Sequence, residues 1–225
     1  MKILGVIPAR LGSTRLHEKV LAPIAGKPMI QHVWERVKQA RELDEVFVAC
    51  DDERIAVCVH GFGGKAVLTR KDHPNGSSRI AEVAEQISAD IYINIQGDEP
   101  TIHGESIDLL ARAFTGGSVE VATLAVRLKG KEDYENPNVV KVVCDQNGDA
   151  LYFSRSPLPF FRDGAAHPEF LKHLGIYGYR RHFLLQYVQW PPSFLESAEN
   201  LEQLRILERG FKIRVLETPH NSWSV

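Results

Sequence analysis

The chain has 225 residues, of which 44% are hydrophobic and 25% charged, a composition typical of a globular protein with its own buried core. Its 27 basic and 29 acidic residues leave a formal net charge of −2, which argues against a uniformly basic surface for nucleic acid. Three scattered cysteines without CxxC spacing favour neither a disulfide framework nor a zinc site and agree with a reducing, cytoplasmic compartment. No apolar run reaches membrane-spanning length, so we expect no membrane insertion.

The first half of the sequence alternates short apolar runs with amphipathic segments. Apolar, β-branched composition predicts buried strands at 2–7, 46–50, 66–69 and 90–96. Helical spacing of apolar residues predicts helices that begin near Pro28, run from about Asp52 to His60, and include Ile80 to Ile87. Strands that alternate with helices predict a mainly parallel α/β sheet through about residue 115, and such sheets bind ligands beyond the carboxyl ends of their strands.

The second half is less regular. Short apolar runs predict strands at 120–126, 138–144, 150–154, 175–180 and 211–217, with the first three in an antiparallel region. A proline-rich excursion covers 155–169, and a single helix is expected from about Glu196 to Glu208, stopped by Gly210. Because no linker or internal repeat is visible, we expect one domain over residues 1–225.

The segment from Pro8 to Lys19, PARLGSTRLHEK, follows the first predicted strand and combines glycine and serine with Arg10, Arg15 and Lys19. Backbone N–H groups of such a turn, together with flanking basic side chains, suit a polyphosphate. The segment has neither the GK[ST] ending of a Walker A loop nor a GxGxxG fingerprint. On residue types alone, a solvated basic loop is an equal alternative.

Asp98 stands in the motif QGDEP at the end of another apolar strand. For this residue alone, an Asx turn before Pro100 is the favoured interpretation. A basic loop at the same edge favours instead a carboxylate that binds Mg²⁺ beside a triphosphate. In HPNGSSR (73–79), Ser77 or Ser78 could cap a helix, and Gly76 would let a nucleotide base approach the backbone. The sequence around His173 and Tyr177 indicates no chemistry by itself, and a packed core pair is the simpler interpretation.

Seven motifs occur in order between residues 7 and 210: IPARLGSTRL, GKPMI, INIQGDEP, NPNVVKVV, ALYFSRSPLP, KHLGIYGYR and LEQLRILERG. Together they resemble the 3-deoxy-manno-octulosonate cytidylyltransferase (CMP-Kdo synthetase) family. CMP-sialic acid synthetases share the early loop but not the KHLGIYGY and LEQLR motifs. The resemblance implies a Rossmann-like nucleotidyltransferase fold with a mixed, mainly parallel sheet and a smaller antiparallel region. It also implies a homodimer, to which the excursion within 155–190 contributes.

The reaction implied by the resemblance is CTP plus 3-deoxy-D-manno-octulosonate (Kdo) giving CMP-Kdo and diphosphate, for lipopolysaccharide biosynthesis, with Mg²⁺ as cofactor. Arg10, Lys19 and Asp98 would be the catalytic residues, and Asp98 would hold the metal. The implied CTP contacts are Ala9, Arg10, Ser13, Lys19, Gly76, Arg79 and Gln96. The implied Kdo contacts are Arg155, His173, Tyr177, Glu202 and Gln203.

Several positions depart from the family pattern. PGKPL reads HEKVL at 17–21, ATD reads ACD at 49–51, and SGT followed by an acid and Arg reads NGSSR at 75–79. In the family the segment matching 75–79 touches the base and ribose, so that change bears on nucleotide selectivity. Two alternatives to the implied reaction stay open: another acid sugar such as 8-amino-Kdo, or a nucleotide-binding dimer without turnover. Family members continue, just after the position of Val225, with VDTPEDL, whose first Asp is a second metal ligand. A chain without that Asp is expected to have weak or no activity.

Overall fold

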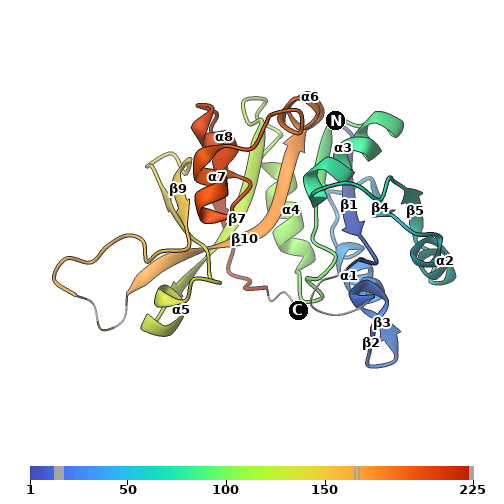
Figure 1. Cartoon of the computed structure of the whole chain (residues 1–225), viewed down its shortest axis with the longest axis horizontal. Helices are drawn as coiled ribbons and strands as arrows, with labels where there is room; N and C mark the ends of the chain where they lie inside the picture. Colours follow the sequence, from blue (N-terminus) through green and yellow to red (C-terminus); the bar gives the residue numbers. More distant parts are fainter. Residues whose placement is uncertain (13–17, 165, 167, 223–225) are drawn as a thin grey trace.

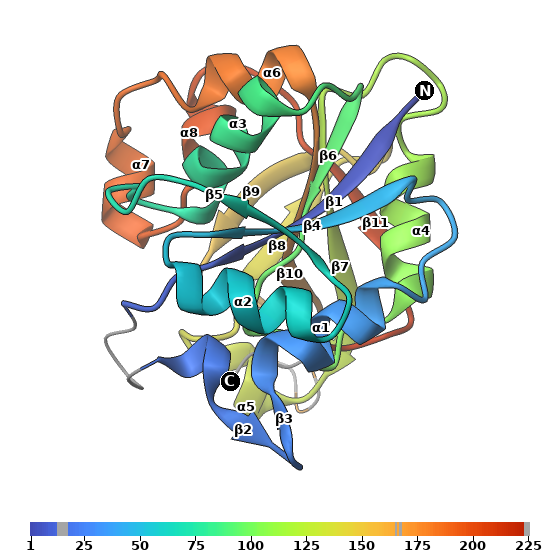
Figure 2. The ribbon, with the colours of Figure 1, turned by 90° about the vertical axis from the view of Figure 1, so that its right-hand side faces the viewer.

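The computed structural model describes residues 1–12, 18–164, 166 and 168–222, so the expected CTP contact Ser13 lies outside the described residues. The described chain has an α/β fold in which a twisted central sheet lies between two layers of helices (Figures 1 and 2). Within these ranges, no helix has both the length and the apolar character needed to cross a bilayer.

The central sheet is mixed but mainly parallel. Its main row follows the order β11 (Arg214–Glu217), β7 (Val121–Lys129), β10 (Glu169–Arg180), β6 (Ile91–Asn94), β1 (Ile3–Ala9), β4 (Glu45–Cys50) and β5 (Lys65–Leu68). β1 is parallel to β4 and β6, whereas β10 is antiparallel to both β6 and β7. The expected fold class is therefore confirmed.

Two smaller antiparallel features accompany the main row of this sheet. β8 (Lys141–Cys144) pairs antiparallel with β10 and with β9 (Ala150–Ser154), which forms the small antiparallel region at the left of Figure 1. A separate hairpin of β2 (Pro23–Ile24) and β3 (Lys27–Pro28) follows the short 3₁₀ helix η1 (Lys19–Leu21) and leads into the first α-helix.

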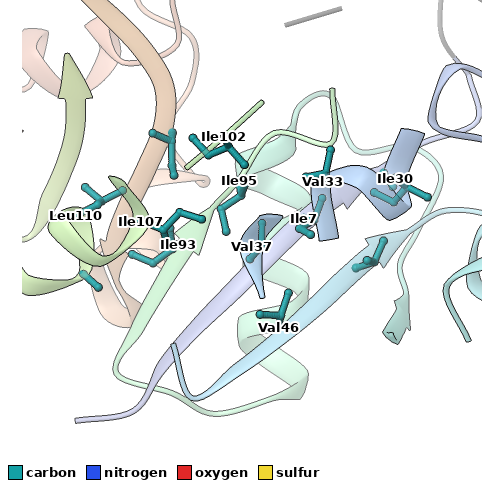
Figure 3. Packing of buried hydrophobic residues seen from close by; sticks show 14 of the residues in the cluster. Ile7, Ile30, Val33, Val37, Val46, Ile93, Ile95, Ile102, Ile107 and Leu110 are labelled. Atoms are coloured by element: carbon teal, nitrogen blue, oxygen red, sulfur yellow. The ribbon is translucent and has the colours of Figure 1, made fainter. Parts of the chain in front are cut away.

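Side chains alternate across the strands and build two cores, one on each face of the sheet. On β1, Ile7 faces one core and Val6 the other, as expected for a strand in which successive side chains point to opposite faces. The first core packs under α1 (Met29–Val37), α2 (Glu53–Gly61) and α4 (Gly104–Arg112), and Figure 3 shows Val33 and Val37 of α1 beside Ile7 and Val46.

The second core lies on the opposite face. It packs under α3 (Gly76–Gln86), α6 (Arg181–Tyr187) and α8 (Leu204–Glu208), next to α7 (Phe194–Glu199), while α5 (Lys131–Glu135) lies near β7. Burying a large aliphatic side chain contributes about 1.5–3 kcal/mol, so the buried residues of both cores stabilise the sheet.

The four strands predicted in the first half are confirmed within a few residues. The apolar runs of β1, β4 and β6 are buried on both faces, whereas β5, at the edge of the sheet, is partly exposed. The single helix predicted from Glu196 to Glu208 is wrong: α7 and α8 are separate. Asn200 breaks them apart because its backbone takes the left-handed conformation, with φ of 52°. Glu202 and Gln203 therefore lie in a turn rather than on a helix face.

Candidate active site

A cavity of about 550 Å³ opens at the carboxyl ends of β1 and β6. Its walls come from segments that are far apart in the sequence: the ends of these two strands, the start of α3, the middle of β10 and the turn between α7 and α8. Residues with expected roles line it as follows: Ala9, Arg10, Lys19, Gly76, Arg79, Gln96, Asp98, His173, Tyr177, Glu202 and Gln203.

One edge of the cavity is formed by alternate residues at and beyond the end of β6. Asn94, Gln96 and Asp98 all line the cavity, whereas Ile93 and Ile95 pack into the core on the other face. The Gln96 amide Nε2 donates to the Gly175 carbonyl at 3.1 Å. Asp98 Oδ2 accepts from Lys19 Nζ at 2.8 Å, so the two residues expected to act on the triphosphate already form an ion pair.

The described ends of the Pro8–Lys19 segment are both held by the corner between β4 and α2. The Leu11 backbone N–H donates to Asp51 Oδ1 at 3.1 Å. At the other end, Arg54 Nη1 donates to Glu18 Oε1 at 2.6 Å, and Arg54 also bonds to Asp52, the N-cap of α2. This corner therefore anchors Leu11 and Glu18, next to the exposed Arg10 and the half-buried Lys19 at the cavity.

The backbones of β1, β6 and α3 approach one another closely behind the cavity, and glycine permits the approach. A Cβ on Gly97 would lie 2.7 Å from the Pro8 carbonyl oxygen. A Cβ on Gly76 would lie 3.2 Å from the Pro8 side chain. Asn75 caps α3 by accepting from the Ser78 N–H at 2.8 Å, so the positive end of the α3 dipole faces the cavity.

Arg79 is only 3% exposed, and its guanidinium is engaged within the fold. Nη1 donates to Thr69 Oγ1 at 2.6 Å and to the Arg70 carbonyl at 3.1 Å, while Nη2 lies 3.6 Å from Asp51 Oδ2. Burial lowers the pKa of Arg79, and the Asp51 carboxylate opposes that effect. Arg79 thus braces the loop before α3 at the cavity wall and lies beside Asp51, whose other carboxylate oxygen accepts from the Leu11 N–H.

Another wall of the cavity comes from β10. An irregularity in its pairing with β7 between Leu174 and Tyr177 exposes the Gly175 carbonyl to Gln96, as bulges do beside functional sites. Burial lowers the pKa of His173 to about 3, so the imidazole is neutral and bonds to the Thr123 hydroxyl at 3.0 Å. Burial also holds the pKa of Tyr177 well above its ordinary value, so its hydroxyl stays protonated.

The turn between α7 and α8 closes the remaining side. Arg205 holds it by bonding both carboxylate oxygens of Glu196, at 2.7 and 2.6 Å, and the Trp190 carbonyl at 2.7 Å. This clamp places Glu202 and Gln203 in the cavity wall. Burial raises the pKa of Glu202, whose Oε2 accepts a long hydrogen bond of 3.4 Å from Ser77 at the start of α3.

Arg155, expected among the Kdo contacts, is not a lining residue of the cavity. Its guanidinium donates to the Glu199 carbonyl at 2.7 Å, the Pro137 carbonyl at 3.0 Å and the Asn200 carbonyl at 3.3 Å. Arg155 therefore ties the end of α7 to the loop before β8. Conversely, Asn94 lines the cavity but is not among the expected residues; its alternation with Gln96 and Asp98 is the sequence signal that could have revealed it.

Among the described residues, no group of three or more His, Cys, Asp or Glu side chains is arranged to hold a metal ion. Mg²⁺ needs no such cage, because it is commonly bound through one or two carboxylates, water and substrate phosphates. The Asp98 carboxylate, 39% exposed at the cavity edge, fits that pattern.

A family model for cytidylyltransferases matches residues 4–213. The chain is 52% identical, over 236 aligned positions, to a 3-deoxy-manno-octulosonate cytidylyltransferase of Geobacter sulfurreducens, covering 100% of this chain and 94% of that protein. It is also 52% identical, over 224 positions, to the protein of that name from Syntrophobacter fumaroxidans, covering 97% and 90% of the two chains.

Solved structures agree with the sequence relatives. A CMP:2-keto-3-deoxy-manno-octonic acid synthetase in complex with CTP superposes with a TM-score of 0.94 at 46% identity, covering 100% of this chain and 93% of that chain. A cytidylyltransferase from Leptospira borgpetersenii, 18% identical, has a TM-score of 0.64 over 100% and 82% of the two chains, which shows the shared fold alone. The chain belongs to the cytidylyltransferase family, among the 3-deoxy-manno-octulosonate cytidylyltransferases.

Proposed function

We propose that this protein transfers CMP from CTP to the anomeric hydroxyl of Kdo and releases diphosphate. One observation carries the proposal: a chain about half identical, over its full length, to enzymes named for this reaction also brings the described CTP and Kdo residues, apart from Arg155, to one cavity. Those residues come from distant parts of the sequence, from Ala9 to Gln203, and only the fold unites them.

The phosphate side supplies charge. In a phosphoryl transfer the protein mainly positions the reactants in line and stabilises the charge that develops on the phosphate oxygens. Lys19 and Arg10 supply positive charge at the carboxyl end of β1, and the amino end of α3 adds its dipole. Diphosphate, the leaving group, is held by the same cations.

The sugar side is built from neutral donors and acceptors. His173 is uncharged, Tyr177 is protonated, and Gln203 is 6% exposed in the wall beside them. These groups orient the Kdo hydroxyls, so the anomeric hydroxyl faces the α-phosphorus. Arg155 acts on this side indirectly, by holding the end of α7 and thus the turn that carries Glu202 and Gln203.

We assign Mg²⁺ to Asp98, where the bound ion would neutralise phosphate charge. Asp98 is paired with Lys19 in this structure, so the ammonium group is held beside the position where a metal–triphosphate complex would lie. The carboxylate orients Lys19 before the nucleotide arrives.

We further propose a homodimer, a cytoplasmic site of action and a role in lipopolysaccharide synthesis. Phe160, 81% exposed, borders a second hollow of about 540 Å³ lined by Tyr134 and Phe161, an apolar surface suited to a second copy of the chain. Cys50, Cys58 and Cys144 are free thiols, in agreement with a reducing compartment.

The test is diphosphate release by the purified protein with CTP and Mg²⁺, with Kdo added or omitted. We expect release that requires Kdo and that falls when UTP replaces CTP or when N-acetylneuraminate replaces Kdo. CMP-Kdo should form in a 1:1 ratio with diphosphate, measured by mass spectrometry. Release only with 8-amino-Kdo would replace the sugar in the proposal, and CTP binding without release with either sugar would refute the reaction.

A further inference from the structure

Asn94 is the buried residue of the cavity wall whose role is unassigned. It is 2% exposed, it lines the cavity, and its Oδ1 has no hydrogen-bond partner among the residues that the structure describes. A buried polar atom without a partner destabilises a fold, so an unpaired amide calls for a ligand or another specific explanation.

The surroundings of Asn94 are polar on the cavity side. Tyr177 is its direct partner across the antiparallel pair of β6 and β10, so both side chains lie on the same face of the sheet. The Tyr177 hydroxyl and the Gln203 amide Nε2 are also buried without partners in the described ranges. On the other side, Asn94 Nδ2 lies 3.7 Å from the position that a Cβ of Gly76 would take.

Two other amides near this wall, those of Gln96 and Asn75, are bonded within the protein. Gln96 donates to the Gly175 carbonyl, and Asn75 accepts from the Ser78 N–H to cap α3. Asn94 has no such structural bond at Oδ1. Its neighbours along β6, Ile93 and Ile95, show that this strand packs well with apolar residues. A purely structural role would therefore be served better by an apolar side chain.

We propose that Asn94 is a further substrate-binding residue, whose carboxamide bonds a sugar hydroxyl between the Gly76 side and the Tyr177 side of the cavity. The proposal rests on the proposed function and deepens it. The hydroxyl belongs either to the ribose of CTP, toward Gly76, or to Kdo, toward Tyr177. Both sources offer the same chemistry, and steady-state kinetics separates them.

The test compares wild type with Asn94→Leu, whose side chain has the same branching and no polar atom. Asn147→Leu, in an exposed turn, is the matched control. We expect the melting temperature of ligand-free Asn94→Leu to equal or exceed that of wild type, because an unpaired amide has been removed. The kcat/KM should fall about tenfold, equivalent to about 1.4 kcal/mol. A fall confined to CTP identifies the ribose, and a fall confined to Kdo identifies the sugar acid.

Two further measurements keep the outcome decisive. Asn94→Ser, which removes the carboxamide without adding apolar bulk, replaces Asn94→Leu if the latter does not fold. Melting-temperature shifts with CTP or Kdo alone test Asn94 independently of turnover. Unchanged kcat/KM for both substrates, or a ligand-free variant less stable than wild type with normal ligand shifts, overturns the proposal. If the wild type binds both substrates but is inactive, the proposed reaction is wrong, and the ligand-induced melting-temperature shifts still test Asn94. If the wild type binds neither substrate, both the proposed reaction and the role of Asn94 are wrong.

Discussion

Glu99 should make this protein less stable as the pH rises. It follows Asp98, is 7% exposed, and accepts a hydrogen bond of 3.1 Å from the Ser222 hydroxyl. Burial raises the pKa of its carboxyl from 4.5 to about 7, and the neighbouring Asp98 charge adds to the rise, while the Ser222 hydroxyl and the Lys172 ammonium oppose it. The folded protein therefore favours neutral Glu99.

The magnitude follows from the two pKa values. Because the pKa of Glu99 is higher in the folded protein than in the unfolded chain, Glu99 stabilises the fold fully below pH 4.5. This contribution to the unfolding free energy is lost as the pH rises through about 7. Each pH unit between the two values is worth about 1.4 kcal/mol, so the full loss is about 3 kcal/mol. Of this, about 2 kcal/mol falls between pH 5.5 and 8.5. Glu99→Gln cannot ionise and should not lose it.

Urea unfolding, followed by circular dichroism at pH 5.5 and 8.5, measures this difference. We expect the unfolding free energy of wild type to fall by about 2 kcal/mol more than that of Glu99→Gln over this interval. Glu85→Gln, at an exposed position of α3, should behave like wild type. The same pH dependence in wild type and Glu99→Gln would refute the reasoning, because it would show that Glu99 is ionised in the fold without cost.

Three further variants test the cavity. Asp98→Asn should lower turnover at limiting Mg²⁺ by about 100-fold or more, and near-normal turnover would refute the metal role. The same change should alter the unfolding free energy by less than about 1 kcal/mol, because the ion pair of Asp98 with Lys19 is partly exposed. Lys19→Ala should lower kcat by about 100- to 1000-fold, with a smaller effect on the KM for Kdo, and an unchanged kcat removes Lys19 from the reaction. Gly97→Ala should cost about 1–3 kcal/mol and lower kcat/KM, because its Cβ would meet the Pro8 carbonyl, whereas Gly116→Ala, with open space around it, should do neither.

The sequence was sufficient for the features that depend on local spacing. The apolar runs at 2–7 and 90–96 predicted β1 and β6, and the spacing of Ile80, Val83 and Ala84 predicted the buried face of α3. The loop from Pro8 and the strand-end Asp98 were expected at one edge because parallel strands bring their carboxyl ends together. α4 was missed, although Ile107, Leu110 and Ala111 show helical spacing.

The arrangement of the proposed Kdo contacts could be established only from the tertiary structure. Asn200 ends α7 in a left-handed conformation, which turned a predicted helix into the turn that carries Glu202 and Gln203. The Arg155 guanidinium does not line the cavity, because the fold brings the carbonyls of Glu199 and Pro137 within hydrogen-bond distance of it. Asn94 lies opposite Tyr177 because β6 pairs with β10 in the sheet. Local periodicity sets which face a residue takes, whereas its partners come from strand pairing between segments dozens of residues apart.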